Sequence, residues 1–184
     1  MTTGGVFTHS YESSAVVRAP VDRVFGHIDD HTRLSSHMSK SSWMMGGGRM
    51  RVELAEGLGK KVGSHMRLAG RVFGIELSVE ETVIERDPPR RKVWETTGSP
   101  KLLVIGQYRM GFELLPDADR TNLRVFIEYA LPAKAPARWL GLLFAGSYAR
   151  WCTRQMANDA VKHFESSAFH EVSTPVSDTQ RRVP

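Results

Sequence analysis

Three tyrosines and one arginine are the polar side chains that could act on a bound carbonyl or hydroxyl group: Tyr108, Arg109, Tyr129 and Tyr148. A tyrosine hydroxyl can move a proton beside a ketone, which is the step that a cyclase or dehydratase requires. A phenol has an ordinary pKa about three units above neutral pH, so this chemistry needs a tuned environment. Holding a bound ligand in one orientation by hydrogen bonds is the milder role for the same groups.

Three other motifs could bind or react, but each pattern favours a structural role. His27 and His31 stand at i and i+4, a metal-binding spacing, yet a helix break is expected between them and no third ligand follows. The segment Gly46-Gly47-Gly48-Arg49 could cradle a phosphate but lacks the Lys-Ser/Thr ending of a P-loop. Cys152 lies on an apolar stripe without an adjacent acid or base. We therefore predict no metal, no cofactor and no catalytic residue.

Length, charge and cysteine count exclude several classes of protein. The chain has 184 residues, a net charge of +5 and one cysteine, which suits one domain without an internal disulfide. The longest strongly apolar run, residues 139–149, has 11 residues, whereas a membrane-spanning helix needs about 20. The first residues lack the regions of a signal peptide, so we expect a cytoplasmic protein. No stripe of basic and aromatic residues occurs, which argues against nucleic-acid binding.

The elements that must position these residues follow from the spacing of apolar side chains. A first strand is expected at about residues 10–19, ended by Pro20. Residues 21–28 have helical spacing, and a second short helix is expected through Leu34. Further alternating runs lie at 50–54, 64–68, 75–80, 93–96, 103–115 and 123–129. The short turns between these runs predict antiparallel pairing.

One long helix is predicted at about residues 136–167. Its expected apolar stripe consists of Leu140, Phe144, Tyr148, Trp151, Cys152, Met156, Ala160 and Phe164. A sheet with one wet face needs cover on the other face, and only this helix is long enough to supply it. We predict an α+β helix-grip fold: a curved antiparallel sheet of about six or seven strands around a long C-terminal helix, with two short helices after the first strand.

Several phrases of the sequence resemble a known superfamily. They are VVRAPVDRVFGHIDD at 16–30, ETVIERDPPRRKVWE at 81–95, GQYRMGFELLPDADRTNLRV at 106–125 and EYALPAKAPARWLGLLF at 128–144. The chain resembles the START-like superfamily (SRPBCC), which includes polyketide cyclase/dehydrase and lipid-transport proteins and the birch-pollen-allergen fold. The resemblance implies one START-like ligand-binding domain at residues 9–168, between a disordered N-terminus at 1–8 and a disordered tail at 169–184. The superfamily shares no catalytic motif, so the resemblance implies no particular reaction.

A cavity is expected where a bent sheet cannot contact a straight helix along its whole length. Aromatic and methionine side chains could line it, or could fill it as ordinary core. The predicted ligand-binding residues are Met45, Met66, Trp94, Tyr108, Met110, Phe112, Phe144, Tyr148 and Trp151. We interpret the chain as a domain that binds or carries a hydrophobic or aromatic small molecule, such as a lipid, a quinone or a polyketide.

Two alternatives remain open at this stage. The first is an enzyme, a polyketide cyclase or dehydratase that uses the same cavity. The second is an interaction module in which residues Trp139–Phe144 make a transient contact with a membrane or a protein, since they are apolar nearly all round the helix. A paired acid and base in the cavity would favour the enzyme, whereas a closed interior with an exposed apolar patch would favour the interaction module. The sequence leaves the oligomeric state open.

Overall fold

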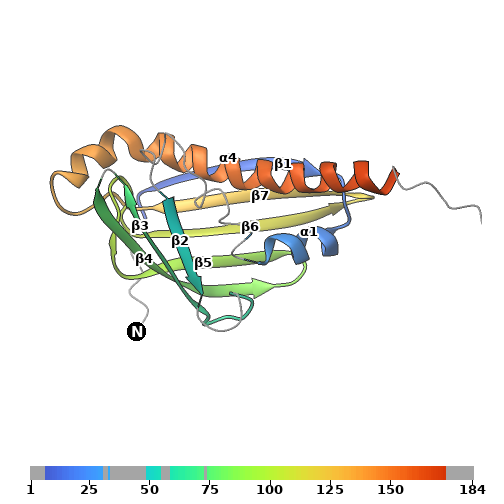
Figure 1. The fold of residues 1–184 in the computed structure, drawn as a ribbon, viewed down its shortest axis with the longest axis horizontal. Coiled ribbons are helices and arrows are strands. Elements are labelled where there is room, and N and C mark those ends of the chain that lie inside the picture. The colour runs from blue at the N-terminus through green and yellow to red at the C-terminus, as the bar shows by residue number, and fades with distance from the viewer. Residues whose placement is uncertain (1–6, 31–32, 34–48, 55–58, 73, 173–184) are drawn as a thin grey trace, which may run out of the picture.

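A computed structural model describes residues 7–30, 33, 49–54, 59–72 and 74–172. These residues form seven strands and two helices, and the order of these elements along the chain matches the predicted order (Figure 1). The elements are β1 (His9–Val17), α1 (Val21–Ile28), β2 (Arg49–Leu54), β3 (His65–Val72), β4 (Ile75–Asp87), β5 (Arg91–Lys101), β6 (Tyr108–Asp117), β7 (Arg120–Tyr129) and α4 (Ala137–Val172).

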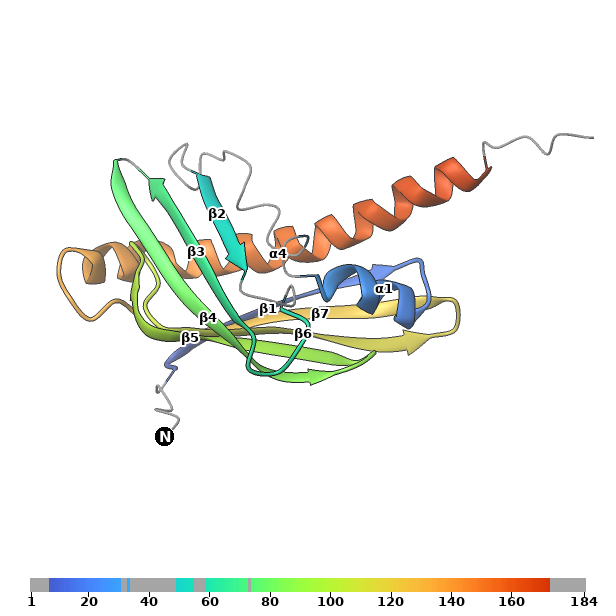
Figure 2. The same cartoon turned by 60° about the horizontal axis from the view of Figure 1, so that its bottom comes forward.

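The strands form one antiparallel sheet in the order β1-β7-β6-β5-β4-β3-β2. Strands β2, β3 and β4 rise from the rest of the sheet toward the side on which α4 lies (Figure 2). Helix α4 runs along β1 and β7, and α1 packs beside β6 under the C-terminal half of α4 (Figures 1 and 2). The predicted helix-grip fold, a curved sheet around a long C-terminal helix, is therefore confirmed.

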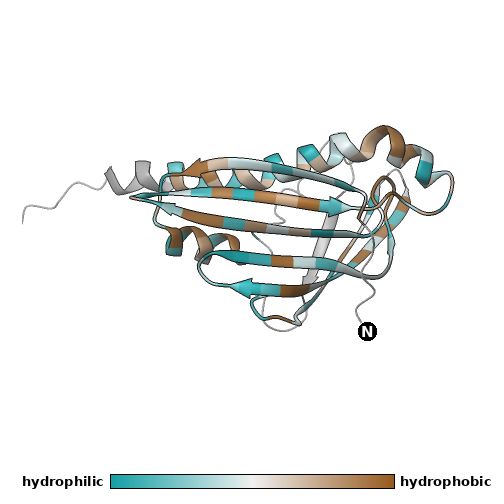
Figure 3. Cartoon of the chain, turned by 180° about the vertical axis from the view of Figure 1, so that it is seen from behind, coloured by the Kyte–Doolittle hydropathy of each residue, from teal (hydrophilic) through white to brown (hydrophobic). Residues whose placement is uncertain are grey.

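Alternating side chains decide which face of the sheet is buried. On β6 the residues Met110, Phe112 and Leu114 point inward, and the register pairs them with Ile127, Val125 and Leu123 of β7. The view from behind shows apolar and polar positions alternating along these strands (Figure 3). Since a one-residue slip would turn every apolar side chain to solvent, this pattern fixes the register.

A buried ion cluster ties α1 to the middle of the sheet. Asp29 ends α1, and its carboxylate accepts hydrogen bonds from Arg86 Nε at 3.1 Å and Nη2 at 2.8 Å. Lys92 is fully buried, with Nζ 2.6 Å from the Asp29 carbonyl oxygen and 3.2 Å from Oδ1. Burial opposes the charge on Asp29, but the hydrogen bonds and the two cations outweigh it, so the pKa of Asp29 is lowered. Burial lowers the pKa of Lys92, partly offset by Asp29.

In its first turns, helix α4 packs against the sheet with other residues than those of the predicted apolar stripe. Gly141, Ala145 and Ala149 are buried, whereas Leu140 and Phe144 are exposed. A Cβ atom on Gly141 would lie 2.9 Å from both Pro132 Cδ and the Val104 carbonyl oxygen, so only glycine fits this approach without a shift. The prediction took the larger apolar residues as the buried ones, but the close contact selects the smallest ones.

Several element limits differ from the predicted ones by a few residues. Strand β1 spans 9–17 rather than 10–19, and β5 continues to Lys101, beyond the predicted run at 93–96. Helix α4 ends at Val172, beyond both the predicted helix end at 167 and the predicted domain limit at 168. The second short helix, predicted through Leu34, falls mostly outside the described residues. In the described part of the chain, no helix combines the length and hydrophobicity that crossing a bilayer requires.

Candidate functional site

A small cavity lies between the inner face of the sheet and α4. Its volume is about 30 Å³. Strands β4, β6 and β7, the connection from β5 to β6, and the middle of α4 each contribute to its wall. The lining residues are Val79, Leu102, Ile105, Tyr108, Met110, Ile127, Tyr148 and Cys152. The wall is therefore mostly apolar, with two phenol groups and one thiol.

Three of the predicted ligand-binding residues line this cavity: Tyr108, Met110 and Tyr148. Trp94, Phe112 and Met66 are buried in the core but lie outside its wall, and Trp151 is half-buried against the same core. Met45 lies outside the described residues. The prediction for Phe144 is corrected by the structure: its side chain is 53 % exposed, because the buried positions of this helical turn are Gly141 and Ala145.

A buried carboxylate lies next to Tyr108 of the cavity wall. Glu81 is 2 % exposed, and the Tyr108 hydroxyl donates a short hydrogen bond to its Oε1. Strand β4 points Leu77, Val79, Glu81 and Val83 to the inner face, so alternation alone brings the carboxylate inside. Sequence reasoning missed Glu81 because the alternating run was followed only to residue 80. Extending the period of two by one step would have found it.

The other polar residues considered from the sequence are placed differently. Arg109 Nη2 lies 3.1 Å from Glu95 Oε2 and its side chain is 37 % exposed, so it belongs to the outer face of the sheet. Tyr129 is buried in the core and stacks on His9, with ring centroids 5.3 Å apart. Neither residue lines the cavity. The structure thus brings Tyr108 and Tyr148 together and separates Arg109 and Tyr129 from them.

The sequence profile of one family covers most of the chain. The profile described as polyketide cyclase/dehydrase and lipid transport matches residues 8–165. The chain belongs to this family. Its resemblance to the START-like superfamily, drawn from the sequence phrases, is therefore confirmed. Among curated proteins, none matches the chain.

Solved structures with the same fold are distant in sequence from this polyketide cyclase/dehydrase family member. The Zhui aromatase/cyclase from a Streptomyces species is 16% identical, with a TM-score of 0.64 over 87% of this chain and 95% of the other. Norcoclaurine synthase from Thalictrum flavum is 15% identical, with a TM-score of 0.57 over 84% of each chain. A Thermus thermophilus protein is 14% identical, with a TM-score of 0.56 over 90% of this chain and 100% of the other. At these identities the likeness shows the fold alone.

The cavity of this family member keeps its phenol and thiol groups protonated. Burial first, and then the nearby charge of Glu81, raises the pKa of Tyr108 well above its usual value. Burial likewise raises the pKa of Tyr148, with Cys152 and Glu81 adding to the effect. These groups can donate hydrogen bonds at neutral pH, but they do not act as anions there. The wall therefore suits an uncharged guest with an oxygen at one end.

Cys152 is expected to resist alkylation in the native protein. Burial, followed by the charge of Glu81, raises the pKa of its thiol from 9.0 to about 12, which lowers the thiolate population about a thousandfold. Iodoacetamide should leave native protein unmodified over hours and modify unfolded protein within minutes, as intact mass spectrometry would measure. The chain has one cysteine, so the mass shift reports this site alone. Equal rates for native and unfolded protein would contradict the burial of this thiol.

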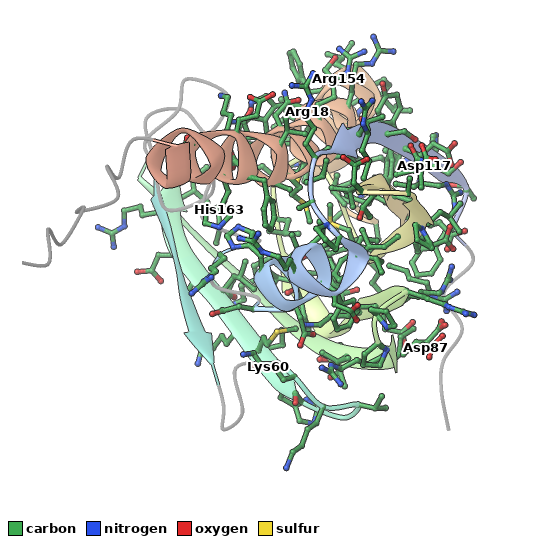
Figure 4. All side chains as sticks on the ribbon, turned by 90° about the vertical axis from the view of Figure 1, so that its right-hand side faces the viewer. Arg18, Lys60, Asp87, Asp117, Arg154 and His163 are labelled. Carbon is green, nitrogen blue, oxygen red and sulfur yellow. The ribbon has the colours of Figure 1, made fainter. Side chains whose placement is uncertain are left out.

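The histidine pair considered for metal binding is only partly described. His31 lies outside the described residues, whereas His27 stacks on His163 of α4 with ring centroids 3.6 Å apart. His163 is labelled in Figure 4. Burial, then the charges of His163 and Arg33, lower the pKa of His27 to about 4, so this ring is neutral at neutral pH. Within the described ranges, no group of three or more His, Cys, Asp or Glu side chains could hold a metal ion.

Proposed function

We propose that this protein binds an uncharged hydrophobic or aromatic small molecule, of lipid, quinone or polyketide type, between the sheet and α4. The observation that carries the proposal is the apolar cavity, whose wall includes Tyr108, hydrogen-bonded to the buried Glu81. Apolar surfaces exclude charged molecules because desolvation of a charge is costly. A hydroxyl or carbonyl on the guest would match the phenol groups of Tyr108 and Tyr148.

The cavity must enlarge to accept such a guest. Its 30 Å³ holds about two water molecules, whereas typical ligand pockets have about 300–1,000 Å³. The connection from β5 to β6 can move most readily, since residues 102–104 are half-buried and belong to no strand or helix. Met110 can also change shape, because its side chain is unbranched and flexible. We therefore infer that the guest displaces this wall rather than entering a preformed pocket.

Direct binding measurements test this proposal. Native mass spectrometry of gently purified protein should reveal a bound hydrophobic molecule, and fluorescence titration should show saturable binding of aminoanthracene. A polycyclic quinone such as anthraquinone should displace the probe. Absence of any bound molecule, together with no saturable probe binding, would overturn the proposal while leaving the fold intact.

A second function, polyketide cyclase or dehydratase activity, is favoured by the Glu81–Tyr108 pair. A carboxylate can accept a proton from the carbon beside a ketone, while a phenol donates a hydrogen bond to the oxygen that becomes negative. Glu81 and Tyr108 are two such groups in contact, and Tyr108 lines the cavity. The structural similarity to an aromatase/cyclase supports this candidate at the level of the fold.

Variants of this pair separate binding from catalysis. Glu81→Gln keeps an acceptor for the Tyr108 hydroxyl but removes the proton-accepting carboxylate, so we expect aminoanthracene affinity to stay within about threefold of wild type. Tyr108→Phe removes a hydrogen bond to a buried carboxylate and should lower the free energy of unfolding by about 1–3 kcal/mol. Fluorescence titration and urea unfolding measure the two effects. Turnover of a linear poly-ketone by wild type that falls at least about a hundredfold in Glu81→Gln would instead establish the enzyme.

A further inference from the structure

The start of α4 carries an exposed apolar patch that contributes nothing to the cavity wall. We call it the α4 patch, and it comprises Trp139, Leu140, Leu142, Leu143 and Phe144. Trp139 is 69 % exposed and Leu143 is 72 % exposed, and they lie one helical turn apart on the outward side. The first turns of α4 are apolar where they project past the end of the sheet (Figure 3). Contiguous exposed apolar side chains of this size mark a contact surface.

The charged residues in the segment of chain that carries the α4 patch are all of one sign. No acidic residue occurs between Glu128 and Asp159, whereas four basic residues do: Lys134, Arg138, Arg150 and Arg154. All four are exposed, and the first turn of α4 has no acidic residue. Acidic residues would ordinarily be favoured there, because the N-terminal end of a helix is partially positive. The surface is therefore complementary to a negatively charged partner.

An anionic bilayer matches this combination better than a protein surface does. Tryptophan, leucine and phenylalanine enter the boundary between headgroups and acyl chains, while flanking lysine and arginine contact lipid phosphates. The α4 patch has apolar residues over most of the circumference of the helix rather than one narrow stripe, because only Gly141 and Ala145 of this stretch are buried. Every exposed side chain of residues 139–144 is apolar and the flanking charges are cationic, which matches a lipid boundary that offers acyl chains beneath anionic headgroups.

We propose that the α4 patch docks this protein on an anionic lipid surface, with Trp139 and Leu143 inserted and Lys134 and Arg138 at the phosphates. The proposal does not depend on what the cavity holds. Its position is nevertheless informative, because Gly141 brings the same helical turn against Val104 in the connection that walls the cavity. Docking would place this wall next to the bilayer.

Vesicle sedimentation tests the proposal. Wild-type protein should bind vesicles of phosphatidylcholine with one third phosphatidylglycerol at least about tenfold more tightly than vesicles of phosphatidylcholine alone, and high salt should weaken this binding. W139E/L143E should lose binding by about a hundredfold. The matched control is Leu115→Glu, which changes an apolar residue on β6 that is 66 % exposed. This control should bind as wild type does.

A charge-reversal pair separates the electrostatic contribution. K134E/R138E should weaken binding to the anionic vesicles at least about tenfold, since each cation near the surface contributes about fivefold. K60E/K61E changes two exposed lysines that precede β3 and should have a much smaller effect. Circular dichroism checks that each variant is folded. The proposal is overturned if wild type binds no vesicle, or if W139E/L143E binds as wild type does. It is also overturned if the patch variants only convert a dimer to a monomer in analytical ultracentrifugation.

Discussion

Asp29→Ala is expected to lower the free energy of unfolding by about 3–5 kcal/mol. The substitution leaves the Lys92 ammonium without its carboxylate partner, and Lys92 is fully buried. It also removes both hydrogen bonds from Arg86, which hold α1 against β4. Breaking one partner of a buried ion pair costs far more than removing an exposed one, because the remaining charge stays out of water. Urea unfolding followed by circular dichroism measures the loss.

Two further variants make this prediction specific. Asp119→Ala removes a carboxylate that is 90% exposed and 3.9 Å from Arg120 Nε, so it should cost less than about 1 kcal/mol. Lys92→Met removes the buried cation, and Asp29 should then depend only on Arg86, so the two substitutions should be non-additive by about 0.5–3 kcal/mol. A loss for Asp29→Ala no larger than that for Asp119→Ala would refute the importance of the cluster.

The same cluster predicts that the protein loses stability as the pH falls into the acid range. The pKa of Asp29 is lowered from 3.8 in the folded protein, so the unfolded chain binds the proton more readily. Its contribution is therefore fully present above the unfolded pKa and is lost as pH falls through the folded pKa, in the acid range below 3.8. Asp29→Ala should flatten this part of the stability profile relative to wild type, as urea unfolding at a series of acid pH values would show.

Val79→Phe is expected to lower the affinity for aminoanthracene by roughly tenfold or more, since it fills the space that a guest would use. Val79 lines the cavity from β4 and is 2 % exposed. A phenyl group extends into a space of only 30 Å³, so the guest and the new side chain cannot both occupy it. Overpacking should also cost about 1–3 kcal/mol of stability. Fluorescence titration of the folded variant measures the affinity.

Val83→Phe is the matched control for the loss of stability. Val83 is fully buried on the same inward face of β4, but it lies outside the cavity wall. Its substitution should cost a similar free energy of unfolding and leave probe binding within about threefold of wild type. If both variants lost binding equally, general loosening of the core would explain the result. If neither did, the guest would bind elsewhere.

The architecture could be predicted because it depends on regular periods along the chain. Alternation placed Met110 and Phe112 on one face of β6, and the predicted hairpin to β7 pairs them with Ile127 and Val125. The segment between Pro136 and Pro175 contains no proline, which allows one long helix. This helix was the only predicted element long enough to cover the sheet. Period and turn chemistry act between near neighbours in sequence, so they can be read without coordinates.

The site could be predicted only in part, because distances between elements decide it. Tyr108, Met110 and Tyr148 lie in the cavity wall, as large residues on the inward faces of β6 and α4, and their role in ligand binding stays a prediction. Phe144 is exposed instead, because the close approach at Gly141 decides which side of the helix is buried, and no period reveals that contact. Glu81 was missed because the alternating run on β4 was followed only to residue 80, and its contact with Tyr108 of β6 depends on a distance between strands that no period reveals.

The absence of a side chain at residue 141 joins two parts of the molecule mechanically. A Cβ there would lie 2.9 Å from the Val104 carbonyl oxygen, so the first turns of α4 pack directly against the segment from Leu102 to Ile105. Any expansion of the cavity that pushes this segment outward also pushes on the helix end beneath Trp139. A guest inside and a bilayer outside would then be thermodynamically linked, and each would change the affinity for the other by the same factor, whichever is added first.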